Sequence, residues 1–189
     1  MSTSVNPARL CVLAGPTAVG KGTVVRELLS RHPEVWLSVS VTTRAARPGE
    51  IDGVHYWFIS TEQFEQMRDA GELLEWAQVH GKHYYGTPRQ PVVEHLAAGK
   101  ATLLEIDLAG ARQVKETMPD ALFVFLAPPS YEELVKRLVG RGTENAAERT
   151  RRLETAQVEL AAASEFDSII VNDTVDNAAS ELAFLMKIG

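Results

Sequence analysis

The 189-residue sequence has little cysteine and no long apolar run. Its single cysteine, Cys11, cannot form an internal disulfide and lies in an apolar segment, so we expect a reducing compartment and a buried structural thiol. No run approaches the roughly 20 apolar residues that span a bilayer, and the first residues do not join a charged start to an apolar stretch. We therefore expect a soluble, cytoplasmic protein without a membrane partner.

Positive charge is also in the minority. The formal net charge is −6, whereas nucleic acids and anionic membranes attract a dominating cationic face. We therefore expect no nucleic-acid partner. A hydrophobic share of 45% and a charged share of 23% are typical of globular proteins, and the length fits one compact domain.

Short, continuous apolar runs predict four buried strands. They lie at 10–14, 102–106, 122–126 and 168–171. Runs that do not alternate are typical of a parallel sheet covered by helices on both faces, and three of the four lead into segments with helical periodicity. The prediction is an α/β fold.

Helix boundaries are marked by caps and breakers. Two capping boxes, in which a serine and a Glu or Gln three residues later satisfy each other's backbone, predict helix starts. They are Ser60 with Gln63, for a short helix ending near Gly71, and Ser130 with Glu133. Further helices are predicted from the first strand to His32, from Pro88 to Gly99, and over about 148–163 and 176–187.

Aromatic residues are unevenly distributed. Seven of the thirteen lie between 38 and 87, beside alternating segments at 38–42 and 53–59. This concentration predicts a second small core, mostly β. We expect a single domain in which 1–37 and 88–189 form the core and 38–87 an inserted lobe.

The firmest chemical signal follows the first predicted strand, as Gly15-Pro16-Thr17-Ala18-Val19-Gly20-Lys21. Glycines let backbone N–H groups converge on a phosphate, the following helix adds positive potential, and lysine supplies a mobile charge. Gly22 stands where the motif usually has a serine or threonine ligand for Mg²⁺, and the hydroxyl comes one residue later, on Thr23. We expect Mg²⁺ to be held mostly by water and nucleotide oxygens, with Thr23 as its protein ligand.

A basic stretch at 136–152 carries six cationic side chains against two acidic ones. Two interpretations are open on composition alone. The stretch forms two solvated helix faces beside a loop, or it supplies the cations that phosphoryl transfer needs around the moving charge.

Seven motifs follow one another along the chain. They are GPTAVGKGT, SVSVTTRAARPGEIDGVHYWF, GELLEWAQVHGKHYYGT, LLEIDLAGA, FLAPPS, GRGTE and IIVND. Together they resemble guanylate kinase over nearly the whole chain, from about Arg9 onward. The resemblance implies a three-layer P-loop NTPase core with a five-stranded parallel sheet, a GMP-binding lobe at 38–87 and a helical lid at about 137–152. It also implies transfer of the γ-phosphoryl group of MgATP to GMP, giving ADP and GDP, with dGMP as a further acceptor.

The resemblance implies roles for residues on the ATP side. The ATP-binding residues are Gly15, Pro16, Thr17, Ala18, Val19, Gly20, Lys21, Gly22, Thr23 and Asn172. Asn172 also fits a turn at the end of a strand. Lys21 and three lid arginines, Arg137, Arg141 and Arg152, are expected to be catalytic, whereas Arg149 and Arg151 are expected to be surface charges.

On the GMP side, Arg44 and Arg47 match the arginines that hold the acceptor phosphate, and two forked cations suit a dianion. Arg44 is also expected to be catalytic. Tyr56 and Tyr85 match the tyrosines that assist them.

The residues expected to contact guanine are those that can accept hydrogen bonds from its N–H groups. Guanine presents N1–H and an amino group where adenine has a lone pair, so a carboxylate selects guanine. Glu75 matches the family's guanine-reading glutamate, and Ser40 and Thr87 match its hydroxyl contacts. Asp107 matches an aspartate near the base and the transferred phosphate, but it also fits a helix N-cap.

Three alternatives are weighed. One is a relative that phosphorylates another phosphorylated small molecule on the same scaffold; Glu75 with Ser40 and Thr87 argues against it. The second is a guanylate-kinase-like module that binds protein partners without turnover; Lys21 and the lid arginines argue against it. The third is a nucleotide-sensing P-loop protein. The sequence leaves the oligomeric state open.

Overall fold

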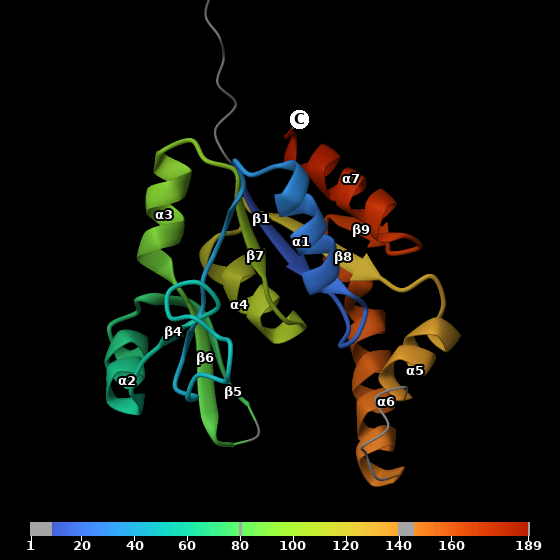
Figure 1. Cartoon of the computed structure of the whole chain (residues 1–189), viewed down its shortest axis with the longest axis horizontal. Coiled ribbons are helices and arrows are strands. Elements are labelled where there is room, and N and C mark those ends of the chain that lie inside the picture. The colour runs from blue at the N-terminus through green and yellow to red at the C-terminus, as the bar shows by residue number, and fades with distance from the viewer. Residues whose placement is uncertain (1–8, 80, 140–145, 189) are drawn as a thin grey trace, which may run out of the picture.

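The computed structural model describes residues 9–79, 81–139 and 146–188, with backbone alone at Val139, 146–149 and Arg152. Two sheets organise these residues (Figure 1). The predicted lid residue Arg141, with Gly140 and Gly142, lies outside the described residues, as does the side chain of Arg152.

The larger sheet has five parallel strands in the order β2-β7-β1-β8-β9. They are β1 (Leu10–Ala14), β2 (Trp36–Leu37), β7 (Thr102–Glu105), β8 (Leu122–Ala127) and β9 (Ser168–Val171). The four strands predicted from apolar runs are confirmed, as is the five-stranded parallel sheet that the resemblance implies. The sequence gives no sign of β2, because a half-buried strand of two residues is too short to show a pattern.

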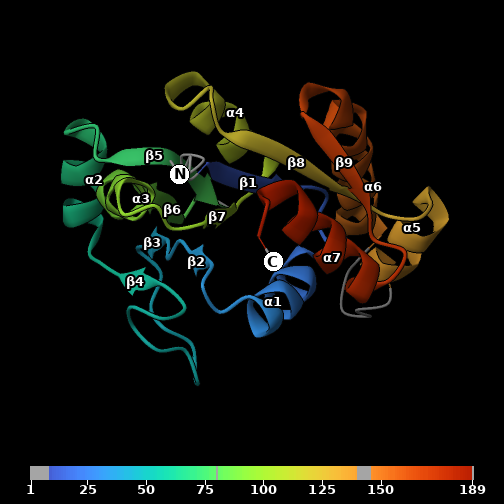
Figure 2. The ribbon, with the colours of Figure 1, turned by 90° about the horizontal axis from the view of Figure 1, so that it is seen from above.

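Helices cover both faces of this sheet, as Figure 2 shows. α1 (Lys21–Arg31) and α7 (Val175–Met186) lie on one face, and α4 (Leu108–Thr117) lies on the other. Alternate residues of β1 enter two different cores. Leu13 packs in the core on the α1 and α7 side, and Val12 packs in the core on the α4 side. Burial on both sides explains why β1 and β8 read as continuous apolar runs. The prediction that all four strands are buried is wrong for the edge strand β9, where Ile169 and Val171 are 49% and 47% exposed.

The smaller sheet has the order β4-β3-β6-β5. It contains β3 (Val41–Thr42), β4 (Trp57–Phe58), β5 (Leu73–Val79) and β6 (His83–Pro88), with α2 (Thr61–Asp69) packed beside it. Phe64 of α2 is fully buried and stacks on Tyr84 with 5.1 Å between ring centroids. The aromatic concentration therefore does mark a small separate core, although each alternating segment supplies only a two-residue strand.

Most helix boundaries agree with their sequence signals. The reciprocal capping box of Ser60 and Gln63 is present at α2, and the Ser130 hydroxyl accepts a hydrogen bond from the Glu133 N–H at 3.2 Å before α5 (Tyr131–Val139). Pro88 is the residue before α3 (Arg89–Ala97) rather than its first residue. The helix predicted at about 148–163 is α6 (Ala146–Ala161), followed by a 3₁₀ turn at Ala162–Glu165.

The smaller sheet and the α5/α6 pair extend from the same end of the core, on opposite sides of it (Figure 1). This is the end where the central strand β1 leads into α1. Within the described ranges, no helix combines the length and apolar character needed to cross a membrane.

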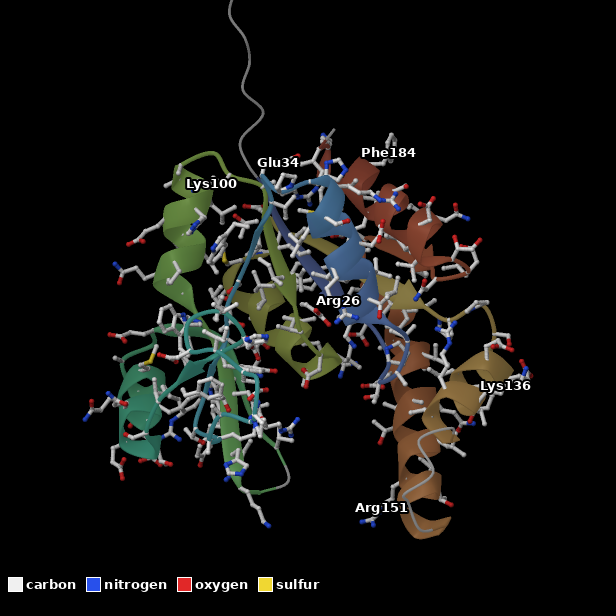
Figure 3. The ribbon with its side chains drawn as sticks, in the orientation of Figure 1. Arg26, Glu34, Lys100, Lys136, Arg151 and Phe184 are labelled. Carbon is white, nitrogen blue, oxygen red and sulfur yellow. The ribbon has the colours of Figure 1, made fainter. Side chains whose placement is uncertain are left out.

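Two phenylalanines test the contribution of the small core. Phe64 is 0% exposed, whereas Phe184 is 79% exposed and lies on the outside of α7 (Figure 3). We expect Phe64→Ala to lower the free energy of unfolding by about 3–5 kcal/mol, because it removes a buried ring and leaves a cavity. Phe184→Ala should change it by less than about 0.5 kcal/mol. Urea denaturation followed by circular dichroism checks this, and equal effects of the two substitutions would contradict it.

Candidate active site

The loop between β1 and α1 turns tightly, and the Val19 N–H donates to the Pro16 carbonyl at 3.2 Å. Gly15, Ala18 and Gly20 have positive φ values of 155°, 66° and 102°. A Cβ on Gly15 would lie 2.4 Å from the backbone oxygen of Leu126 in β8, so the loop can approach the neighbouring strand only with glycine there. The turn delivers the N-terminus of α1 to the carboxyl end of the central strand, where free N–H groups and the helix dipole favour an anion.

Lys21 is the first residue of α1 and folds back over the loop. Its Nζ donates to the carbonyl oxygens of Gly15 at 2.7 Å and Pro16 at 3.4 Å. Burial lowers the pKa of the ammonium group, and the negative charges of Glu105, Glu159 and Asp107 oppose that shift. A lysine charge is therefore held at the loop by neutral oxygens and supported by carboxylates.

Two distant side chains donate to the loop carbonyl of Val19. Arg137 Nη1 of α5 lies 3.1 Å from this oxygen, and Nδ2 of Asn172, which follows β9, lies 2.8 Å from it. Asn172 is 4% exposed, and its amide would stand 2.8 Å from a Cβ on Gly20. Asn172 thus lies at the end of a strand, directly after β9, and its buried amide supports the loop.

Glu159 of α6 also reaches the loop and was not singled out from the sequence. Its Oε2 accepts a hydrogen bond from the Thr17 N–H at 3.1 Å. Burial raises the pKa of this carboxyl, against the Thr17 hydrogen bond and the Lys21 charge. No local motif marks Glu159, because its partner lies at the other end of the chain.

A pocket of about 510 Å³ opens beside the loop. It is lined by Ala18, Gly20, Thr23, Lys136, Arg137, Asn172, Asp173 and Val175. Five of these are predicted ATP-binding or catalytic residues, so the pocket joins the loop to the start of the basic stretch. A larger cavity, of about 780 Å³, lies at the opposite end of the sheet near Leu10 and Leu122, and its lining residues are not among those predicted.

Gly22 lies against Glu105, the last residue of β7. A Cβ on Gly22 would be 3.5 Å from Glu105 Oε1. Burial raises the pKa of Glu105, opposed by the charges of Lys21 and Arg26. The hydroxyl of Thr23 accepts from Arg26 Nη2 at 3.2 Å. A carboxylate thus stands beside the position where the loop motif usually carries its hydroxyl.

A buried carboxylate marks the smaller sheet. Glu75 on β5 is 8% exposed and pairs across the sheet with Thr87 of β6, whose hydroxyl donates to Oε1 at 2.6 Å. α4 approaches the same group, since a Cβ on Gly110 would lie 2.9 Å from Glu75 Oε2. Burial raises the pKa of Glu75 to about 7; the Thr87 hydrogen bond opposes this shift and the charge of Asp107 adds to it.

Asp107 connects the two regions. Its Oδ1 accepts from the Gly110 N–H at 2.7 Å, so the N-cap alternative is confirmed for the start of α4. The same carboxylate acts on the pKa of both Lys21 and Glu75. The residues at the carboxyl end of β7 therefore lie between the phosphate loop and the smaller sheet, at the edge where open α/β sheets bind ligands.

The predicted acceptor-phosphate residues form one cluster. Arg44 makes a two-point ion pair with Glu50, with Nη1 to Oε2 at 2.8 Å and Nη2 to Oε1 at 2.9 Å. Its Nε donates to the Tyr85 hydroxyl at 3.0 Å, and its guanidinium lies 5.3 Å from the ring centroid of Tyr56. The side chain of Arg47 is exposed beside this cluster, and half-buried Ser40 lies just before β3.

Glu50 was not identified from the sequence as a functional residue. Its position three residues after Arg47, across a Pro-Gly turn, was a signal that could have identified it. Hydrogen bonds from Arg44 and from the Arg47 backbone hold the pKa of Glu50 at about 2. The same carboxylate raises the pKa of Arg44, so both groups stay charged.

A family model described as guanylate kinase matches residues 7–188. The chain belongs to the guanylate kinase family. Enzymes of this family transfer a phosphoryl group from ATP to GMP, giving GDP. The family, the α/β P-loop kinase fold and the kinase activity expected from the motifs are confirmed.

Curated guanylate kinases are similar to the chain over nearly its full length. The enzyme of Bifidobacterium longum is 60% identical over 186 residues, covering 96% of this chain and 95% of the relative. That of Thermobifida fusca is 60% identical over 180 residues, covering 95% and 91%. The crystal structure of guanylate kinase from Anaplasma phagocytophilum matches with a TM-score of 0.75 at 33% identity, covering 97% of this chain and 88% of that one.

The buried carboxyl of Glu75 predicts a pH dependence of the free energy of unfolding. The pKa of Glu75 rises from 4.5 to about 7 on folding, so the folded state binds the proton more tightly than the unfolded state. This contribution to stability is complete below pH 4.5 and is lost as the pH rises through 7. Relative to Glu75→Gln, the wild type should lose about 2–3 kcal/mol of unfolding free energy between pH 5 and pH 8. Urea denaturation at both pH values checks this; parallel changes in the two proteins would contradict it.

Proposed function

We propose that the phosphate-loop residues bind ATP and the smaller-sheet residues bind GMP in the phosphoryl transfer that guanylate kinases catalyse. The observation that carries this assignment is the buried pair of Glu75 and Thr87, with its 2.6 Å hydrogen bond. A buried carboxylate on the same sheet as the arginine cluster can select a purine by its N–H donors, which a sugar phosphate lacks.

On the donor side, the backbone of residues 15–23 would hold the ATP phosphates, with Lys21 adding its charge. Arg137 already contacts the loop from α5, and we assign Arg141 and Arg152 as further lid cations. Asn172 would lie at the rim of the adenine site, in the pocket beside the loop. Phosphoryl transfer depends on alignment and on cations around the moving charge, and these residues provide both.

On the acceptor side, Glu75 would accept hydrogen bonds from guanine N1–H and the amino group, and its charge would repel the adenine N1 lone pair. The Thr87 hydroxyl orients one carboxylate oxygen toward itself. Ser40 and Asp107 would complete the base contacts. The remaining acceptor residues, Arg44, Arg47, Tyr56 and Tyr85, would hold the GMP phosphate. Because the assigned contacts address the base and the phosphate rather than the ribose 2′-hydroxyl, we include dGMP as an acceptor.

These assignments divide the domain into a core (1–37 and 88–189), a GMP-binding lobe (38–87) and a lid (about 137–152). The lobe and the lid helices extend from the same end of the core (Figure 1). Arg151, in the half of α6 that lies away from the core, is exposed, as expected for a surface charge (Figure 3). Closure of lobe and lid would exclude water, which otherwise diverts ATP to hydrolysis.

Mg²⁺ is the cofactor we assign to ATP, and the oxygen donors at the loop fit it. Within the described part of the chain, no three His, Cys, Asp or Glu side chains gather into a metal cage, which suits a cation that keeps several waters. We propose that two side chains would hold the metal ion: Thr23 directly and Glu105 through a water molecule. When bound, the metal neutralises charge on the ATP phosphates.

The acceptor assignment is tested by ADP release with GMP, AMP, UMP and CMP. GMP should be the preferred acceptor, and Glu75→Gln should reduce the GMP-to-AMP preference by about 10²–10⁴-fold, because guanine loses its selecting carboxylate. Lys21→Ala should suppress turnover with every acceptor while leaving the preference largely intact. Equal loss of preference in the two variants, or a wild type that does not favour GMP, would contradict the assignment.

The Glu105 assignment is tested by calorimetry of ADP binding with Mg²⁺ and with EDTA. Mg²⁺ should strengthen ADP binding by the Glu105→Gln variant about tenfold less than it strengthens binding by the wild type. The reason is that the water molecules on the metal lose an anionic hydrogen-bond partner. In EDTA, the variant should bind ADP no more weakly than the wild type does, because the substitution removes a negative charge near the phosphates. Glu116→Gln, an exposed carboxylate on α4, is the matched control. The same Mg²⁺-dependent gain in all three proteins would overturn the assignment.

A further inference from the structure

Arg44 is almost fully engaged before any phosphate binds. An arginine has five N–H donors, and four hydrogen bonds are formed here. Nε reaches Tyr85 at 3.0 Å, Nη1 reaches the Ala45 carbonyl and Glu50 Oε2, both at 2.8 Å, and Nη2 reaches Glu50 Oε1 at 2.9 Å. The side chains of Arg44 and Glu50 are only 11% and 18% exposed. The guanidinium is therefore held by a geometrically specific two-point pair that is largely shielded from water.

Glu50 also closes the turn that carries Arg47. Its Oε2 accepts from the Arg47 N–H at 2.7 Å, and its own N–H donates to the Arg47 carbonyl at 3.0 Å. The turn passes through Gly49, whose φ is 87°. One carboxylate thus fixes the guanidinium of Arg44 and the backbone of Arg47 together.

Aromatic rings restrict the same guanidinium from the side. The Arg44 guanidinium lies 5.3 Å from the Tyr56 ring centroid and 5.8 Å from that of Phe58. Tyr56 in turn meets the edge of Tyr85 at 5.8 Å between centroids. The orientation of Arg44 is therefore determined by contacts from four side chains.

Glu50 can influence an incoming phosphate in two opposite ways. Its negative charge repels the phosphate, and its contacts order the cations that bind it. Displacing Glu50 would break two charge-assisted bonds in a shielded site and open the Arg47 turn. Leaving it in place keeps one Nη2 hydrogen of Arg44 and the exposed Arg47 side chain available, with the Arg44 side chain and the Arg47 backbone already ordered. Ordering is the effect that the geometry favours.

We propose that Glu50 is a positioning residue for the acceptor phosphate: it holds Arg44 and the Arg47 turn in the binding arrangement and stays in place when GMP binds. The inference rests on the proposed phosphate-binding role of Arg44 and Arg47. It assigns to Glu50 a selective effect on GMP, exerted through Arg44 and the Arg47 turn, rather than a general effect on the fold.

Glu50→Gln is the direct test. Glutamine has one carbonyl oxygen and one NH₂ donor, so it cannot accept from both Nη groups and from the Arg47 N–H. We expect KM for GMP, and the dissociation constant of GMP measured alone by calorimetry, to rise about tenfold or more, because the cations must be ordered on binding. KM for ATP should stay within about twofold. Asp69→Asn is the matched control, because Asp69 pairs with Arg68 at 2.9 Å in the same lobe; it should leave both constants unchanged.

A mutant cycle with the pair Arg44→Lys and Arg47→Ala separates positioning from a structural role. If Glu50 acts through these two arginines, Glu50→Gln should add little to the GMP defect of the variant that carries both substitutions. Additive losses, or parallel losses of GMP and ATP affinity, would overturn the inference, as would tighter GMP binding by Glu50→Gln. A GMP defect in Arg44→Lys without one in Glu50→Gln overturns this inference alone. Unchanged GMP affinity in Arg44→Lys and in Arg47→Ala overturns the proposed phosphate site as well.

Discussion

The close approach of Gly15 to β8 is the constraint on which the site depends. With no room for a Cβ beside the Leu126 carbonyl, the chain leaves the central strand in a turn that only glycine fits without strain. That turn fixes where α1 begins and therefore where Lys21 stands. Because β1 lies between β7 and β8, residues that follow β7, such as Asp107, meet the loop from one side, and Asn172 after β9 meets it from the other.

Carboxylates are unexpectedly prominent around the proposed substrate site, although the proposed ligands are anions. Burial raises the pKa of Glu75, Glu105 and Glu159, and each faces a specific partner: the Thr87 hydroxyl for Glu75, the charges of Lys21 and Arg26 for Glu105, and the Thr17 N–H for Glu159. Glu50 is the opposite case, since its donors hold its pKa low. The family's polyanionic substrates thus enter a site where cations are held in place by acidic partners. Such pairing orders the cations without adding a large net positive charge, which agrees with a chain whose net charge is −6.

Local signals in the sequence predict local structure well and long-range contacts poorly. The phosphate loop, the four apolar strands and the capping box of Ser60 depend on residues a few positions apart, and all are present. The contact of Glu159 with Thr17 spans 142 positions, and no periodicity or motif connects the two. The strand β2 was not predicted from the sequence, because its two residues are too few to show a pattern and pair only with β7. Glu75 and Thr87 were identified through the family resemblance, since their pairing arises only when β5 and β6 align.

The α5/α6 pair and the loop between β1 and α1 are joined by side-chain hydrogen bonds. Arg137 of α5 donates to the Val19 carbonyl, and Glu159 of α6 accepts from the Thr17 N–H. A loop shaped to present its N–H groups to an anion leaves backbone polar groups in need of partners, and these two side chains supply them with opposite charges. The position of α5 and α6 is thereby tied to the conformation of the loop. A change in either helix at these positions alters the support of the loop, although both residues lie more than a hundred positions away in the sequence.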